Sequence, residues 1–105
     1  NSTRDWGYAP EYVRGMWQML QHDSPDDFVL ATNHGYSVRD FLKFSFEVVN
    51  LNWERYVICD ERYLRPTEVP ALIGDFSKAQ KDLGWVPKTL APDLASILVK
   101  HALSL

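Results

Sequence analysis

Short, continuously apolar runs alternate with helical patterns along this chain, and that alternation limits the possible fold more than any other feature. Residues 28–31 and residues 56–59 are two such runs. Runs of this length and composition are typical of strands that are buried on both faces, as in a parallel sheet. Residues 71–74 provide a further candidate for a short strand. The sequence therefore predicts an α/β fold in which short strands lie between helices.

Three to four helices are predicted around these strands. The first begins near Pro10, because proline suits the first turn of a helix, and it ends at Ser24 and Pro25. Gly15 inside this helix indicates close packing against a neighbour, since glycine there costs about 1 kcal/mol relative to alanine. Four apolar residues recur at helical spacing and give this helix one apolar face. They are Val13, Met16, Trp17 and Leu20.

The remaining helices carry recognisable end signals. Ser37 and Asp40 resemble a capping box, with aspartate in the usual place of glutamate. The helix that follows has apolar residues on more than one side, so we expect it to be largely covered. Asp75 is predicted to cap a helix that Gly84 ends, and Pro92 opens the last one.

A stiff segment near the middle of the chain holds the candidate binding residues. Pro66 and Pro70 restrict the backbone, so residues 60–70 are predicted to form a defined extended loop. The guanidinium of Arg65 is suited to a phosphate, and Glu68 can accept hydrogen bonds from vicinal hydroxyls. Together they suggest a site for a sugar nucleotide. A surface loop held by ion pairs is the alternative interpretation.

Arg4 is a second candidate for the same site. It precedes Trp6 and Gly7, just before the first amphipathic helix, which could place its guanidinium beside the stiff loop. The alternative is a pair between Arg4 and Asp5, or a bond from Arg4 to a carbonyl at a helix end.

No complete active site can be read from the residues. The chain has no G-x-S-x-G elbow, no glycine-rich nucleotide loop and no Tyr followed four residues later by Lys. Its three histidines show no spacing that predicts a metal ligand or a base, and the clustered Cys and His of a zinc site are absent. With a net charge of −3 and no basic run, nucleic acid is not predicted as the main partner.

The single cysteine, Cys59, rules out an internal disulfide and fits a reducing compartment. It ends an apolar run, so we expect it to be buried. No apolar stretch reaches 18 residues and no signal peptide is visible, which favours a cytoplasmic protein. Because the chain does not begin with methionine, we expect residues 1–105 to be one domain of a longer protein.

Several stretches resemble the second half of the GDP-mannose 4,6-dehydratase family. The R-P-x-E/D-V element is shared by many extended short-chain dehydrogenases that act on nucleotide sugars, whereas R-D-W-G and F-V-L-A-T are more specific to the dehydratase. The similarity covers nearly the whole chain in the right order. The matching stretches are residues 4–13, 16–21, 26–32, 63–69, 74–79 and 83–87.

The resemblance implies a fold and a set of site residues. It implies the small C-terminal substrate-binding domain of an extended short-chain dehydrogenase, without its Rossmann part. By resemblance Arg4 and Arg65 meet the diphosphate of GDP-mannose and Glu68 meets the ribose hydroxyls, while Tyr63 lines the same cleft. The catalytic Thr or Ser, Glu, Tyr and Lys of the family belong to the N-terminal half, so none is assigned here.

The resemblance also implies a reaction and partners. The family uses NADP, held by the N-terminal Rossmann domain, to convert GDP-mannose to GDP-4-keto-6-deoxymannose by elimination of water. We expect this chain to be inactive alone, to pack on that Rossmann domain and to belong to a homo-oligomer. Two alternatives stay open. The chain is a non-catalytic remnant that mediates protein contacts, or it is the same portion of another GDP-sugar reductase or epimerase.

Overall fold

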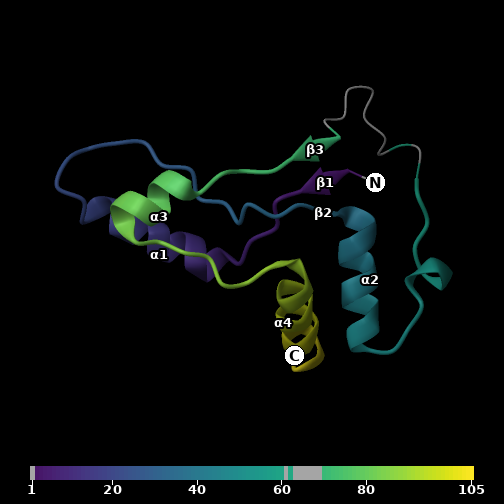
Figure 1. Cartoon of the computed structure of the whole chain (residues 1–105). Helices are drawn as coiled ribbons and strands as arrows, with labels where there is room; N and C mark the ends of the chain where they lie inside the picture. The colour runs from purple at the N-terminus through teal and green to yellow at the C-terminus, as the bar shows by residue number, and fades with distance from the viewer. Residues whose placement is uncertain (1, 61, 63–69) are drawn as a thin grey trace.

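A computed structural model describes residues 2–60, 62 and 70–105 of the chain. Within these residues the fold contains four α-helices, three two-residue strands and the 3₁₀ turn η1. Figure 1 shows their arrangement. In chain order they are β1 (Thr3–Arg4), α1 (Ala9–Leu20), β2 (Tyr36–Ser37), α2 (Val38–Val48), η1 (Trp53–Arg55), β3 (Ala71–Leu72), α3 (Ser77–Leu83) and α4 (Ala91–Leu103).

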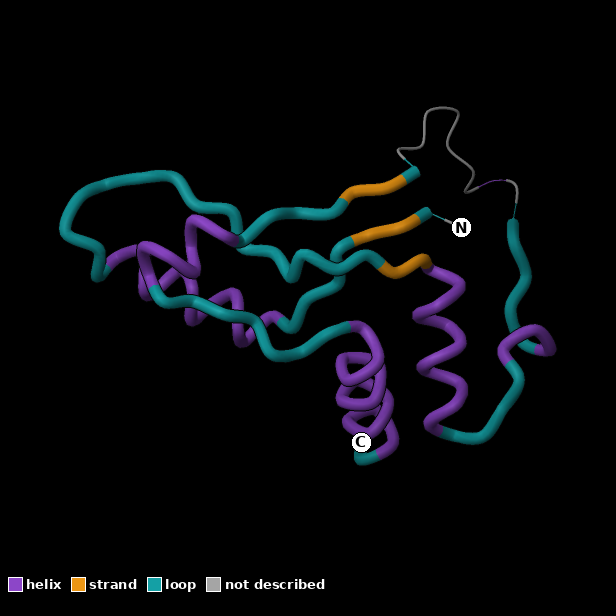
Figure 2. The backbone as a smooth tube through the Cα atoms, in the orientation of Figure 1, coloured by secondary structure: helices purple, strands orange, loops and turns teal. Residues whose placement is uncertain are grey.

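The sheet has β1 at its centre. β1 pairs antiparallel with β2 and parallel with β3, so the strand order is β2-β1-β3. Arg4 lies opposite Tyr36 on one side and Leu72 on the other. The amide of Thr3 also donates to the carbonyl of Pro70 at 2.9 Å. Three segments that are far apart in the sequence therefore meet at β1 (Figure 2).

The helices form two pairs. α1 packs against α3 at one end of the molecule and α2 packs against α4 at the other (Figure 1). The result is long and flat, with extents of 52 × 38 × 19 Å and a radius of gyration of 16.4 Å. A compact domain of about 100 residues has a radius of gyration of about 13 Å. The two helix pairs therefore do not close around one common core.

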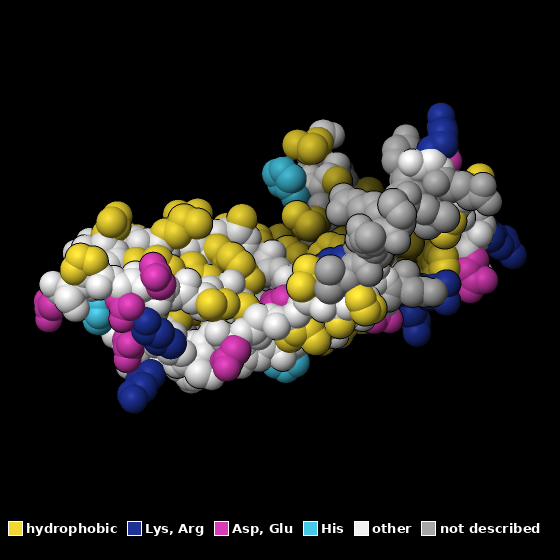
Figure 3. Space-filling model, turned by 90° about the horizontal axis from the view of Figure 1, so that it is seen from above, with side chains coloured by type: hydrophobic (Ala, Val, Ile, Leu, Met, Phe, Trp, Pro, Cys, Tyr) yellow, Lys and Arg dark blue, Asp and Glu magenta, His cyan; other side chains and the backbone are white. Residues whose placement is uncertain are grey.

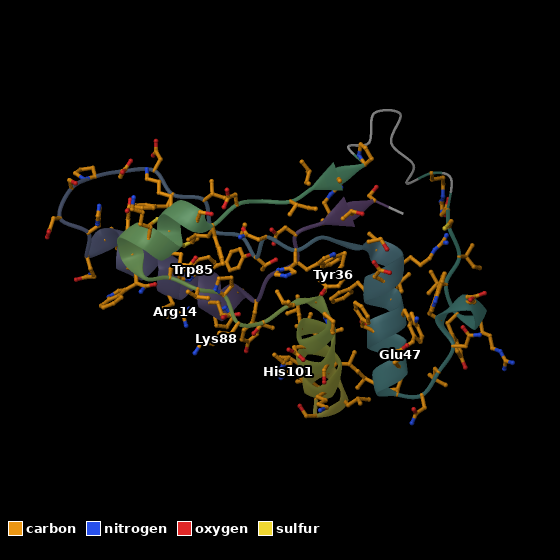
Figure 4. The ribbon with its side chains drawn as sticks, viewed as in Figure 1. Arg14, Tyr36, Glu47, Trp85, Lys88 and His101 are labelled. Atoms are coloured by element: carbon orange, nitrogen blue, oxygen red, sulfur yellow. The ribbon has the colours of Figure 1, made fainter. Side chains whose placement is uncertain are left out.

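Trp85 lies between two other aromatic rings. Its side chain is fully buried, and the edges of the Tyr12 and Phe76 rings lie against it. Its indole N–H donates to the backbone carbonyl of Glu11 at 2.8 Å, which ties the loop after α3 to the first turn of α1. Figure 4 shows Trp85 on the segment that runs from α3 toward α4. The other buried apolar residues are Ala31, Ala79, Ala91, Leu94 and Ala95.

The carboxylate of Glu11 adds a second connection at the same place. Its two oxygens accept from the amides of Lys88 and Thr89, at 2.6 and 2.9 Å. Arg14, one turn along α1, donates to the carbonyl of Val86 at 3.0 Å. The backbone leading into α4 is thereby fixed to α1.

Several local predictions are confirmed. Pro10 lies in the first turn of α1. Ser37 and Asp40 form the complete capping box at the start of α2. Gly84 ends α3 with a left-handed φ of 71°, a conformation that favours glycine. Gly15 is buried, and a Cβ there would crowd the side chain of Leu30 and the indole of Trp85.

The apolar face predicted for α1 is present, and it is exposed in this chain. Val13, Met16 and Trp17 are between 57% and 62% exposed, and Leu20 is 81% exposed. The face that packs inward contains Glu11 and Gly15. Figure 3 shows hydrophobic side chains gathered over the end of the molecule that carries α1 and α3. The helical periodicity is real, but no described residue covers this face.

The first two strand predictions are wrong. Residues 28–31 and residues 56–59 have no strand assignment, because no described strand pairs with either run. Only the predicted strand at residues 71–74 is confirmed, as β3. Ile58 is 91% exposed and Cys59 is exposed, so the expected burial of Cys59 is wrong as well.

α2 is less covered than predicted, because none of its residues is fully buried. Ring contacts protect its inner side: Trp6 stacks on Phe41 with centroids 4.3 Å apart, and Tyr36 meets Phe44 edge-on. The prediction that Asp75 caps α3 is wrong by one residue, because the N-cap of this helix is Phe76. Its carboxylate still accepts from the amide of Ser77, the first residue of the helix.

The Glu11 connection predicts a stability that depends on pH. Burial alone would raise the pKa of Glu11, but hydrogen bonds from Lys88 and Thr89 and the charge of Arg14 leave it below its ordinary 4.5. A lowered pKa in the folded state stabilises the fold above pH 4.5, and that contribution is lost as the pH falls through the folded value. We expect Glu11→Gln to lower the free energy of unfolding by about 1–3 kcal/mol at pH 7.

Urea denaturation at pH 7 and at pH 3 measures this effect. The difference between wild type and Glu11→Gln should shrink from pH 7 to pH 3, because the wild-type carboxyl takes up a proton as the pH falls through its lowered pKa. Glu47→Gln, on the exposed side of α2 (Figure 4), is the matched control and should change stability little at either pH. Equal stability of wild type and Glu11→Gln at pH 7 would contradict the role given to Glu11.

Candidate functional site

The predicted site residue that the structure describes, Arg4, lines an open cavity of about 400 Å³. Arg4 and Asp5 come from β1 and its end, and Tyr12 comes from the first turns of α1. The other walls are largely aliphatic and come from two backbone segments, residues 29–31 and residues 72–74. The cavity thus combines a cation, a carboxylate and a phenol with apolar walls, a composition typical of small-molecule sites.

Arg4 is held at the centre of the sheet. Its Nη1 donates to the carbonyl of Thr3 at 2.8 Å, and its side chain is half-buried. The parallel pairing of β1 with β3 sets Arg4 beside Leu72. The chain enters β3 from Pro70, which closes the stiff loop predicted from the sequence. The sheet therefore sets the backbone of Arg4 beside Leu72, two residues after Pro70.

Three predicted site residues, Tyr63, Arg65 and Glu68, lie outside the described residues. Their roles stay predictions.

Asp5 is the site residue whose role the sequence did not reveal. One oxygen accepts from the amide of Thr32 at 2.9 Å and from its hydroxyl at 2.7 Å. The other accepts from the amides of Asn33, at 3.2 Å, and Gly74, at 3.1 Å. Because these donors are 27 to 69 residues away in the chain, nothing in the local sequence signals them. The only hint was the position of Asp5 inside R-D-W-G.

The other two residues of R-D-W-G shape the same region. The indole N–H of Trp6 donates to the carbonyl of Tyr36 at 2.8 Å, which fastens the end of β1 to β2. Gly7 lies under the Tyr12 ring, and a Cβ at Gly7 would overlap that ring. The pKa of Tyr12 is raised, first by burial and then by the nearby charges of Asp5 and Glu11. Tyr12 therefore stays protonated at neutral pH.

The described residues show no catalytic or metal-binding cluster. No three His, Cys, Asp or Glu side chains in this part of the chain lie close enough to hold a metal ion. His34 places Nδ1 at 2.8 Å from the carbonyl of Thr32, and the His22 ring packs edge-on against Phe28. Both of these histidines have structural contacts.

The described residues do not fit a dinucleotide either. α1, α2 and α4 follow Tyr8, Ser37 and Leu90, and none of these helices starts from a glycine-rich loop that would let a pyrophosphate approach. Across the described ranges, no helix has the length and apolar character needed to cross a bilayer.

Comparison with known proteins identifies the family. The model of the family described as "GDP-mannose 4,6 dehydratase" matches residues 1–98. This chain belongs to the GDP-mannose 4,6-dehydratase family. It is 49% identical over 104 residues to GDP-mannose 4,6 dehydratase 1 of Arabidopsis thaliana, covering 99% of this chain and 29% of that relative. It is 40% identical over 119 residues to the Homo sapiens GDP-mannose 4,6 dehydratase, covering 97% of this chain and 32% of that protein.

Solved structures of related enzymes share the fold. A UDP-glucose 4-epimerase from Bifidobacterium longum, crystallised with NAD⁺ and UDP, matches 99% of this chain and 31% of its own with a TM-score of 0.82 and 25% identity. A UDP-glucose 4-epimerase from Thermotoga maritima, solved with UDP-glucose, matches 98% of this chain and 32% of its own with a TM-score of 0.84 and 22% identity. The chain thus has the fold of one portion of an extended short-chain dehydrogenase. It spans about a third of the length of the relatives and solved structures described above.

Proposed function

We propose that this chain provides the GDP-mannose-binding portion of a GDP-mannose 4,6-dehydratase. The observation that carries the proposal is the β1–β3 pairing, which puts Arg4 beside the strand that follows the R-P-T-E-V stretch. Arg4, Arg65 and Glu68 would then bind one nucleotide sugar, with the two arginines on the diphosphate and the glutamate on the ribose. Tyr63 would line the same cleft.

The whole enzyme would convert GDP-mannose to GDP-4-keto-6-deoxymannose. NADP, which would supply the oxidation and reduction at the sugar, would bind outside this chain, because the described residues do not form a cradle for it. The contribution of this chain is to hold the substrate, and we expect no turnover from it alone.

Binding depends on Arg4 in this proposal. An arginine-to-phosphate hydrogen bond is charge-assisted, so Arg4→Gln should raise the dissociation constant for GDP-mannose about tenfold or more. Titration calorimetry or an NMR titration with the 105-residue chain measures this change. Arg55→Gln, an exposed arginine of η1, is the control and should leave the constant unchanged. Equal affinities of wild type and Arg4→Gln would contradict the proposed site.

The exposed face of α1 supports a second part of the proposal. We define the α1 face as Val13, Met16, Trp17 and Leu20. A set of large apolar side chains on one helix face is unusual for a surface that stays in water. The curated relatives are about three times as long as this chain. We propose that the α1 face packs against the Rossmann portion of the enzyme.

An uncovered α1 face should make the isolated chain self-associate. We expect Trp17→Glu to shift the chain toward monomer, because it places a charge at the centre of the face. Sedimentation velocity at several concentrations measures this shift. Lys43→Glu, on the exposed side of α2, is the control and should change nothing. Monomeric wild-type chain at high concentration would contradict the proposed docking face.

Self-association also bears on the competing function, a protein-contact module without a substrate. Stable dimers with no measurable binding of GDP-mannose would favour that module. A related GDP-sugar reductase or epimerase is a weaker candidate. The matched family model is that of a dehydratase, and the two relatives described above, at 49% and 40% identity, are named as dehydratases.

A further inference from the structure

We propose that Asp5 is a positioning residue for the nucleotide-sugar site, one that fixes the distance between Arg4 and the neighbouring cavity wall at residues 72–74. This inference rests on the proposed function. It adds a residue that does not touch the substrate itself but acts through Arg4.

The carboxylate of Asp5 joins three separate segments. It follows β1 directly and accepts hydrogen bonds from Thr32, Asn33 and Gly74. Arg4 and Gly74 line the same cavity as Asp5. A shift of the Asp5 carboxylate would therefore move Arg4 and the cavity wall relative to each other.

The sheet alone is too short to hold that distance. β1 and β3 pair over two residues each, Thr3 with Ala71 and Arg4 with Leu72. Isolated pairings of this length are weak. The bond from Gly74 to Asp5 continues the connection past the end of the ladder, at 3.1 Å. Asp5 thus supplies the contact that the strands lack.

The surroundings leave little room for an alternative placement. A Cβ on Gly74 would overlap the Cβ of Ala31, so the cavity wall packs directly on the neighbouring segment. Asn33 has a left-handed φ of 64°, and its side chain accepts from the amide of Phe76 at 2.9 Å. The turn that Asp5 binds is therefore also fixed to Phe76, two residues after Gly74.

A carboxylate is the group that these donors require. An ionised aspartate only accepts hydrogen bonds, whereas asparagine would direct an NH₂ group toward one set of donors. Asp5→Asn should keep the contact with Thr32 through one oxygen and lose the contacts with Asn33 and Gly74. Arginine binds phosphate with a fixed fork, so a small displacement of Arg4 weakens the bond.

A double-mutant cycle on GDP affinity separates positioning from a general loss of fold. Asp5→Asn should raise the dissociation constant for GDP about tenfold when Arg4 is present. It should change that constant less than about threefold in the Arg4→Gln background, because the residue it positions is gone. The structural variant Glu11→Gln is the control, and its effect should be the same in both backgrounds.

The outcomes are distinct. Failure of the wild-type chain to bind GDP overturns the proposed function, and this inference with it. Binding by wild type, with an equal effect of Asp5→Asn in both Arg4 backgrounds or with no effect at all, overturns the Asp5 inference alone. Should Asp5→Asn fail to fold, amide exchange in the wild type decides: the amides of Asn33 and Gly74 should be protected, and exchange as fast as in a free loop would overturn the inference.

Discussion

The contact between Trp85 and Glu11 is the interaction on which most of the observed packing depends. The indole fills the largest fully buried position and donates to the Glu11 carbonyl, while the Glu11 carboxylate accepts from the backbone leading into α4. One residue pair thereby connects α1, α3 and the start of α4. Outside it, the described core consists mainly of alanines and one leucine. In a core this small, we expect one buried glutamate to contribute measurably to stability.

The small number of buried apolar side chains also explains the shape of the molecule. α1 and α3 form one packed group, α2 and α4 form another, and the short sheet joins them. The apolar residues that would complete a larger core lie on the α1 face and at Val29, which is 55% exposed. Such surfaces fit a chain that packs against a further portion of a longer enzyme, as the length of its relatives suggests.

Sequence reasoning succeeded where the signal is local and failed where it depends on a neighbour. Pro10, the Ser37–Asp40 capping box and Gly84 were readable because each acts on its own helix end. The strands at residues 28–31 and 56–59 were not, because a strand needs a partner and none is described there. Arg4 could be selected as a site residue from R-D-W-G and the family resemblance. Asp5 could not, since its donors are distant in sequence.

The central claim is that the cavity beside β1 binds GDP-mannose. An NMR titration of the ¹⁵N-labelled chain with GDP-mannose tests it most directly, because it reports where a ligand binds. We expect saturable shifts of the amides of residues 3–5 and 72–74, with the amides at the end of α4 unchanged. Shifts confined to other surfaces, or none at millimolar GDP-mannose, would contradict the account.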